Sequence, residues 1–165
     1  MKRTIKIIIF AILFVFLVFL VENLVRQRAS MKAGSPERIF EEKSPTAAGL
    51  MPLLLNGERI LVEVADTDAL RTRGLSFRDE LSSDRGMLFV LPSSEYAGFW
   101  MKDMKFSIDI IWLDEKKKIA HIEQAVSPES FPRIFYPDKK SLYVIEVPAG
   151  FSQKHNLRVG DPISF

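Results

Sequence analysis

The chain has 165 residues, enough for one globular domain and an additional segment. It contains no cysteine, which excludes disulfides, thiolate metal sites and a cysteine nucleophile. Its net charge of +2 is unevenly distributed: residues 1–49 carry eight Lys or Arg against four Asp or Glu, and residues 50–165 carry fifteen against seventeen. The second part is weakly acidic, so we expect no nucleic acid among its partners.

The N-terminal region has the features of a membrane anchor. Three basic residues precede an uninterrupted apolar run at residues 7–21. With neighbouring apolar residues the run extends to Val25, close to the length of about 20 residues that a membrane-spanning helix needs. Arginines follow where the small residues of a cleavage site belong. The sequence therefore predicts a transmembrane signal-anchor helix over residues 1–28, with a cleaved, secreted form as the alternative.

A short charged N-terminus usually stays in the cytoplasm, so we expect the remainder to be exported. The C-terminal domain would then lie on the periplasmic or extracellular side of a bacterial membrane. Residues 29–52 contain three prolines and two glycines and are predicted to be a linker. The folded domain is expected over residues 53–165.

This domain is predicted to be mostly β, with one or two short helices. A helix is expected over residues 68–73, capped by Asp66 or Thr67 and ended by Gly74. A further helical turn or two is expected over residues 151–157. About seven or eight short strands separated by turns are typical of a compact β-sandwich or a barrel-like domain. The clearest strand patterns lie at residues 60–64, 87–91, 99–101, 108–113, 119–122, 142–147 and 163–165.

Both tryptophans lie in one apolar stretch, residues 86–114, where we expect any site. Trp100, Met101 and Trp112 are predicted to be core residues, because large apolar side chains gain most from burial. The alternative for this group is an aromatic platform for a sugar ring. Asp109 begins a probable buried strand, so its charge requires a partner. An ion pair with Arg73, Arg78 or Lys102 is expected, and a functional carboxylate is the alternative.

Several motifs follow one another in an order that resembles a known family. They are RGLSFR at residues 73–78, GMLFV at 86–90, FWMKD at 99–103, DII at 109–111, VIEVPAG at 144–150 and GD at 160–161. The pattern resembles domain of unknown function 192 (DUF192), also called UPF0127, over about residues 63–165. The resemblance implies a compact, mostly β fold of the sandwich kind, often behind a signal or anchor, and supplies no established activity. The chain departs from the usual pattern at Asp103-Met104, where Asn-Thr is common.

The main hypothesis for function is a membrane-anchored, exported domain that binds a saccharide or a protein partner at the cell envelope. The alternatives are a glycosidase-like hydrolase that uses two carboxylates roughly 5–9.5 Å apart, and a scaffold without a ligand. The sequence leaves catalysis open. No metal-binding, nucleophile-elbow or dinucleotide motif is present, so no metal or cofactor is expected. The predicted site residues are Arg73, Arg78, Trp100, Lys102, Asp103, Asp109 and Glu146.

Overall fold

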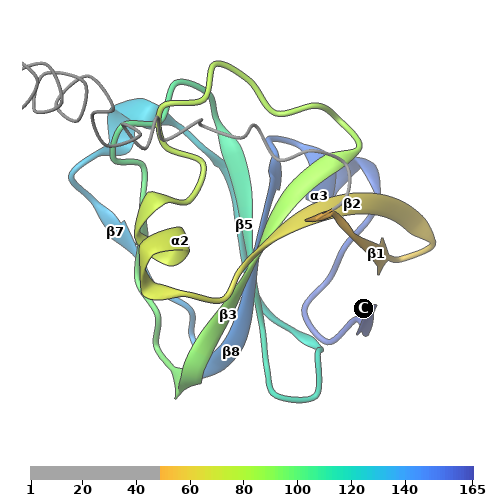
Figure 1. Ribbon diagram of the computed structural model, residues 1–165. Helices are drawn as coiled ribbons and strands as arrows, with labels where there is room; N and C mark the ends of the chain where they lie inside the picture. Colours follow the sequence, from red (N-terminus) through yellow and green to blue (C-terminus); the bar gives the residue numbers. More distant parts are fainter. Residues whose placement is uncertain (1–48) are drawn as a thin grey trace, which may run out of the picture. The chain divides into compact units, whose positions relative to one another are not determined.

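The computed structural model describes residues 49–165, which form a strongly curved sheet flanked by short helices (Figure 1). The predicted anchor, residues 1–28, and most of the predicted linker lie outside these residues. Within them, no helix is long and apolar enough to cross a membrane. The elements are β1 (Met51–Leu55), β2 (Glu58–Ala65), α2 (Asp68–Arg73), β3 (Arg85–Glu95), β4 (Phe99–Trp100), β5 (Ile108–Leu113), β6 (Ile119–Val126), the 3-10 helix η2 (Pro128–Ser130), β7 (Ile134–Phe135), β8 (Ser141–Pro148), α3 (Phe151–Lys154) and β9 (Ile163–Ser164).

Seven strands form one sheet in the order β6-β5-β8-β3-β2-β1-β9, and β4 and β7 form a separate two-stranded ribbon. Within the large sheet only β2 and β3 run parallel; the other neighbours are antiparallel. A parallel pair needs a crossover connection, and here that connection contains α2. The crossover places α2 and the residues that follow it against one face of the sheet.

The sheet curves into a half-barrel whose two outer strands approach each other at one end. Ile119 donates its backbone N–H to Asp161 (2.9 Å) and accepts one from Gly160 (2.8 Å). Lys118 and Pro162 form a β-bridge beside these bonds. The prediction of a mostly β domain with few short helices is confirmed. Of the two predicted arrangements the barrel-like one is present, because one sheet bends around its own core instead of two sheets packing face to face.

Both faces of the sheet are covered, so all six residues of β5 are buried. One face packs against α3, and we call it the α3 face. The other packs against Leu75 after α2, against Met101 after β4 and against β7, and we call it the α2 face. The two helices lie on opposite sides of the central strands (Figure 1). Core residues of the α3 face include Leu88, Ile111, Ile145, Val147 and Phe151, and those of the α2 face include Phe89, Ile110, Trp112 and Val144.

The predicted helix over residues 68–73 is confirmed as α2. Thr67 caps it, since its hydroxyl accepts a hydrogen bond from the Leu70 N–H (3.3 Å). Gly74 ends it with a left-handed φ of 51°, and Phe89 lies 3.4 Å from where a Cβ would stand. A side chain at this position would therefore be both strained and crowded. The second helix, α3, is a single turn at the start of the region predicted to be helical.

Candidate functional site

The structure places the two buried acids of the central strands on opposite faces of the sheet. Glu146 in β8 pairs with Ile110 in β5, and Asp109 pairs with Val147. Successive side chains of a strand point to opposite faces. Glu146 therefore belongs to the α2 face and Asp109 to the α3 face.

Asp109 is fully buried, and backbone amides hold its carboxylate. One oxygen accepts hydrogen bonds from the N–H groups of Ala125 (2.8 Å) and Gly150 (3.0 Å), and the other accepts one from Ser152 (2.8 Å). Gly150 and Ser152 belong to the first turn of α3, so the carboxylate satisfies donors that a helix N-terminus leaves unpaired. Three amides thus occupy the place of the predicted ion pair, and Asp109 has a structural role.

Glu146 is also buried, with 5 % of its surface exposed, but its surroundings differ. Its Oε2 atom has no hydrogen-bond partner among the described residues. Burial raises the pKa of this carboxyl to about 8, although the positive charge of Arg78 acts in the opposite direction. A carboxyl in this state is mostly protonated at neutral pH, so it can donate a hydrogen bond as well as accept one.

Arg78 is fixed beside this carboxyl by Glu63. The guanidinium makes two parallel hydrogen bonds to the Glu63 carboxylate, of 2.5 and 2.8 Å. These bonds raise the pKa of Arg78 above its ordinary value. The strand register aligns Glu63, Met87 and Glu146 in one row across β2, β3 and β8. A permanent positive charge therefore lies over the α2 face, paired with Glu63 and within electrostatic reach of Glu146.

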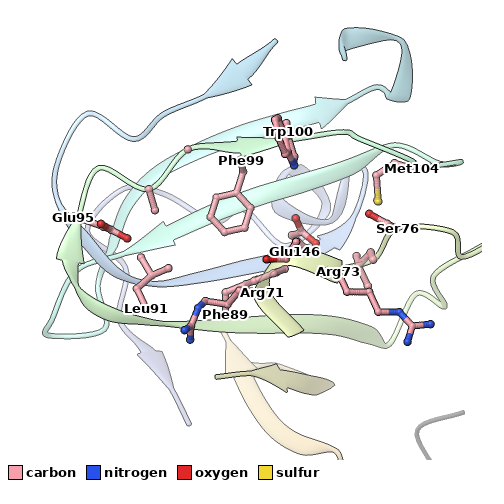
Figure 2. Close-up of a pocket in the computed structure, with 15 residues that line it drawn as sticks. Arg71, Arg73, Ser76, Phe89, Leu91, Glu95, Phe99, Trp100, Met104 and Glu146 are labelled. Atoms are coloured by element: carbon pink, nitrogen blue, oxygen red, sulfur yellow. The ribbon is translucent and has the colours of Figure 1, made fainter. Parts of the chain in front are cut away.

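Glu146 lines a cavity of about 280 Å³ on the α2 face. In Figure 2 its carboxyl lies near the centre, with Phe99 and Trp100 on one side and Arg71 on the other. The walls combine apolar and aromatic side chains with six polar or charged ones, so neither kind dominates. The volume is at the lower end of the range for small-ligand sites. The lining comprises Arg71, Thr72, Arg73, Gly74, Leu75, Ser76, Phe89, Leu91, Glu95, Ala97, Gly98, Phe99, Trp100, Met104 and Glu146.

A second cavity of about 510 Å³ adjoins the first. The two share four lining residues: Thr72, Arg73, Ser76 and Trp100. The second is lined in addition by Phe77 and by charged side chains from α2 and from the turn after β4. Those charged residues are Asp68, Lys102 and Asp103.

The predicted site residues are only partly brought together. Arg73 and Trp100 line both cavities, Glu146 lines the first, and Lys102 and Asp103 line the second. Arg78 lines a separate hollow of about 230 Å³ next to Glu63. Asp109 lines none of these three cavities.

The prediction that Trp100 is a core residue is wrong, because 49 % of its surface is exposed. Met101 and Trp112, predicted with it, are buried as expected. The run alternates as a strand does, so Trp100 points away from the core between two inward-facing neighbours. Because Phe99, Trp100 and Met101 are all apolar, the sequence does not show which of them points outward.

Arg71 was not predicted as a site residue. It forms one wall of the first cavity and donates hydrogen bonds to the backbone carbonyls of Asp66 (2.6 Å) and Val90 (2.7 Å). It also pairs with Asp68 (2.6 Å). These bonds join α2 to β3 and fix the shape of the cavity. Of these contacts, only the pair with Asp68 can be recognised in the sequence, because the two opposite charges lie three residues apart on a helix.

Within the cavity that Glu146 lines, the described residues do not supply a pair of carboxylates at the separation that a glycosidase requires. Asp109 lies on the other face, and Asp103 lines the other cavity. Glu95 shares the first cavity with Glu146, but its partner in β8 is Ser141. Ser141 precedes Glu146 by five residues, or about 16 Å along a strand, compared with the roughly 5–9.5 Å needed. No group of three or more His, Asp or Glu in the described region is placed to hold a metal ion.

The domain is similar to proteins whose activity has not been assigned. The DUF192 family, described as "Uncharacterized ACR", matches residues 52–165. A UPF0127 protein of Thermococcus gammatolerans is 34 % identical over 106 residues, covering 63 % of this chain and 65 % of the relative. A UPF0127 protein of Pyrococcus abyssi is 31 % identical over 109 residues, covering 63 % and 85 %. The chain thus spans just under two thirds of the length of the Thermococcus relative.

A solved structure shares this fold. It is a protein of unknown function from Novosphingobium aromaticivorans, with a TM-score of 0.66 and 26 % sequence identity. The similarity covers 70 % of this chain and 85 % of that one.

Proposed function

The chain belongs to the DUF192 (UPF0127) family of uncharacterised proteins, and we propose that its domain binds one unit of a saccharide in the cavity lined by Glu146. The observation that carries this proposal is the unpaired Oε2 of Glu146, buried at the cavity. A buried polar atom without a partner costs about 1–3 kcal/mol. A ligand that supplies the missing partner recovers this free energy on binding.

A sugar ring fits both components of the cavity. Its C–H faces pack against aromatic walls such as Phe99 and Trp100, while its hydroxyl and acetamido groups exchange hydrogen bonds with Glu146. The protonated carboxyl suits a neutral ligand better than a cation, because it offers no negative charge. The volume of about 280 Å³ favours a single ring over a chain.

A protein partner is the second candidate, and exposed apolar side chains around the β4–β7 ribbon favour it. Phe131, Ile134 and Tyr136 are all exposed, and Phe131 makes an edge contact with Trp100. Large apolar groups gathered on one surface are a common feature of protein interfaces. Catalysis is less well supported than either kind of binding, since Glu95, the other carboxylate of this cavity, pairs with Ser141, five residues from Glu146 along β8.

We also propose that the N-terminal segment anchors the domain to a membrane and that the domain is exported. The support is the apolar run at residues 7–21 with basic residues on both sides. A C-terminal alkaline phosphatase fusion in a bacterial host tests this location. Enzyme activity in the membrane fraction is the expected result, and an inactive fusion would contradict export.

Binding is tested on the full chain in detergent, by thermal unfolding with glucose, N-acetylglucosamine and glucuronic acid. A sugar at about 100 times its dissociation constant should add roughly 2.7 kcal/mol to the free energy of unfolding. Glu146→Met should abolish this effect and raise the stability of the free protein, because it removes the unpaired oxygen. Glu95→Gln, which changes another carboxylate of the same cavity, is the matched control and should still bind. A panel in which no sugar stabilises the protein would exclude saccharide binding.

A further inference from the structure

Building on this proposed function, we propose that the site has two parts, and that the hollow between Phe77 and Trp100 binds the next unit of an oligosaccharide. The two cavities adjoin at Trp100, since both are lined by Trp100 and by Thr72, Arg73 and Ser76. An oligosaccharide with one ring over Glu146 would place its next ring in the second hollow. The ligand class is therefore a saccharide of at least two units.

Phe77 is the observation that marks the second hollow. It has a left-handed φ of 68°, which is strained for a bulky side chain, and 67 % of its surface is exposed. Its neighbour Leu75 is buried in the core of the α2 face. The backbone therefore holds the apolar ring of Phe77 in solvent two residues after the position at which the Leu75 side chain is buried.

Two hydrogen bonds keep the ring there. The Phe77 N–H donates to the carbonyl of Asp103 (2.8 Å), and the Ser76 hydroxyl donates to the carbonyl of Lys102 (2.9 Å). Asp103 itself has a left-handed φ of 58°. The segments after α2 and after β4 thus hold each other in strained conformations at the cavity that both line. Strain of this kind is concentrated at binding sites, where the surrounding structure maintains it.

The charges around the hollow favour a neutral polyhydroxylated unit. Asp68 and Asp103 oppose Arg73 and Lys102, so the lining carries no net charge. Lys102 Nζ lies 6.0 Å from the centre of the Trp100 ring. These groups offer donors and acceptors to hydroxyls, while Phe77 and Trp100 offer apolar surface to the C–H faces of a ring.

The test compares N-acetylglucosamine, chitobiose and chitotriose by calorimetric titration of the full chain in detergent. Chitobiose should bind about tenfold more tightly than the monosaccharide, equivalent to about 1.4 kcal/mol. Phe77→Ala should remove this gain and leave the affinity for the monosaccharide unchanged. Phe77→Gly, which suits the left-handed backbone, should behave in the same way if Phe77→Ala unfolds. Tyr96→Ala is the matched control, because Tyr96 is 55 % exposed and lines neither cavity.

The outcomes separate the two proposals. If the monosaccharide binds and chitobiose binds no more tightly, the second hollow is not a subsite and the first proposal stands. A gain with chitobiose that survives both Phe77 variants would likewise overturn the inference. If none of the three sugars binds, saccharide binding at the Glu146 cavity fails, and this inference fails with it.

Discussion

The two faces of the central sheet treat a buried acid in opposite ways. On the α3 face, the carboxylate of Asp109 accepts three backbone hydrogen bonds. On the α2 face, Glu146 has a buried oxygen without a partner, and it lines a cavity. Both residues are buried and lie on paired strands, so burial alone does not distinguish a scaffold residue from a site residue. The satisfaction of their hydrogen bonds does.

The difference follows from what packs on each face. The α3 face is closed by elements that bring their own backbone donors to Asp109: the β6 residue Ala125 and the first turn of α3. The α2 face is covered by side chains from β4, from β7 and from the segments that follow α2 and β4, which provide apolar contacts and few donors. The fold therefore compensates one charge and leaves the other carboxyl uncharged.

The largest predicted effect is a pH dependence that Glu146 alone produces. Its folded pKa of about 8 lies above the ordinary value of 4.5, so the folded state holds a proton that the unfolded state releases between these pH values. The stability that this proton contributes is fully present below pH 4.5 and is lost as the pH rises towards 8. At about 1.4 kcal/mol per pH unit, the loss approaches roughly 5 kcal/mol. Urea unfolding from pH 5 to 9 measures it.

Glu146→Gln is the variant that isolates this effect, since an amide has the same shape and does not titrate. The gap in unfolding free energy between the variant and the wild type should widen with pH and become constant above pH 8. Parallel curves would show that the carboxyl is ionised or partnered in solution. The contrast between the two faces would then be lost.

Asp109→Asn is expected to destabilise the protein by about 3 kcal/mol. Each hydrogen bond to a charged group is worth about 1.5–3 kcal/mol. The asparagine NH₂ group is a donor and would face backbone N–H groups that are also donors. A lower melting temperature, with sugar binding retained by the folded fraction, is the expected result. Asp66→Asn is the control, because it makes the same chemical change at an exposed position. A variant as stable as the wild type would mean that the three backbone hydrogen bonds do not require the negative charge of Asp109.

Arg78→Gln should cost about 1–2 kcal/mol, since Glu63 is half-buried and would lose its partner. Removal of the guanidinium also removes the charge that lowers the pKa of Glu146. The pH interval over which stability is lost should therefore extend upwards, beyond 8. Arg59→Gln, at an exposed site, should leave that interval unchanged. An unchanged interval in Arg78→Gln would place Arg78 outside the electrostatic reach of Glu146.

Local patterns predicted much of this fold. The helix α2 was predicted with its cap and end, because Thr67 and Gly74 act through bonds within a few residues. β5 was predicted as a buried strand because its apolar run is also a local pattern. The β1–β2 hairpin was missed, although its turn residues Asn56 and Gly57 are a strong hairpin pattern and both have left-handed φ angles.

The contrast between the two acids could not be predicted, because it depends on register. Glu146 points to the α2 face because it pairs with Met87 of β3 on one side and with Ile110 of β5 on the other. The donors of Asp109 come from residues 16, 41 and 43 positions away. No local pattern contains either relation. A search for acids within apolar strands finds both residues but cannot distinguish their roles.

The smallest predicted effect is that of Trp100, and its comparison with Trp112 tests whether the open part of the α2 face is separate from its core. Trp112 is fully buried, and its Nε1–H donates to the carbonyl of Ala97 (3.0 Å) in the cavity wall, so Trp112→Phe should cost about 2 kcal/mol. Trp100→Phe should change the stability by less than about 0.5 kcal/mol, because half of Trp100 is already exposed. Urea unfolding of both variants measures the difference. If Trp100→Phe proves as costly as Trp112→Phe, Trp100 packs inward in solution, and the two cavities on either side of it are closed.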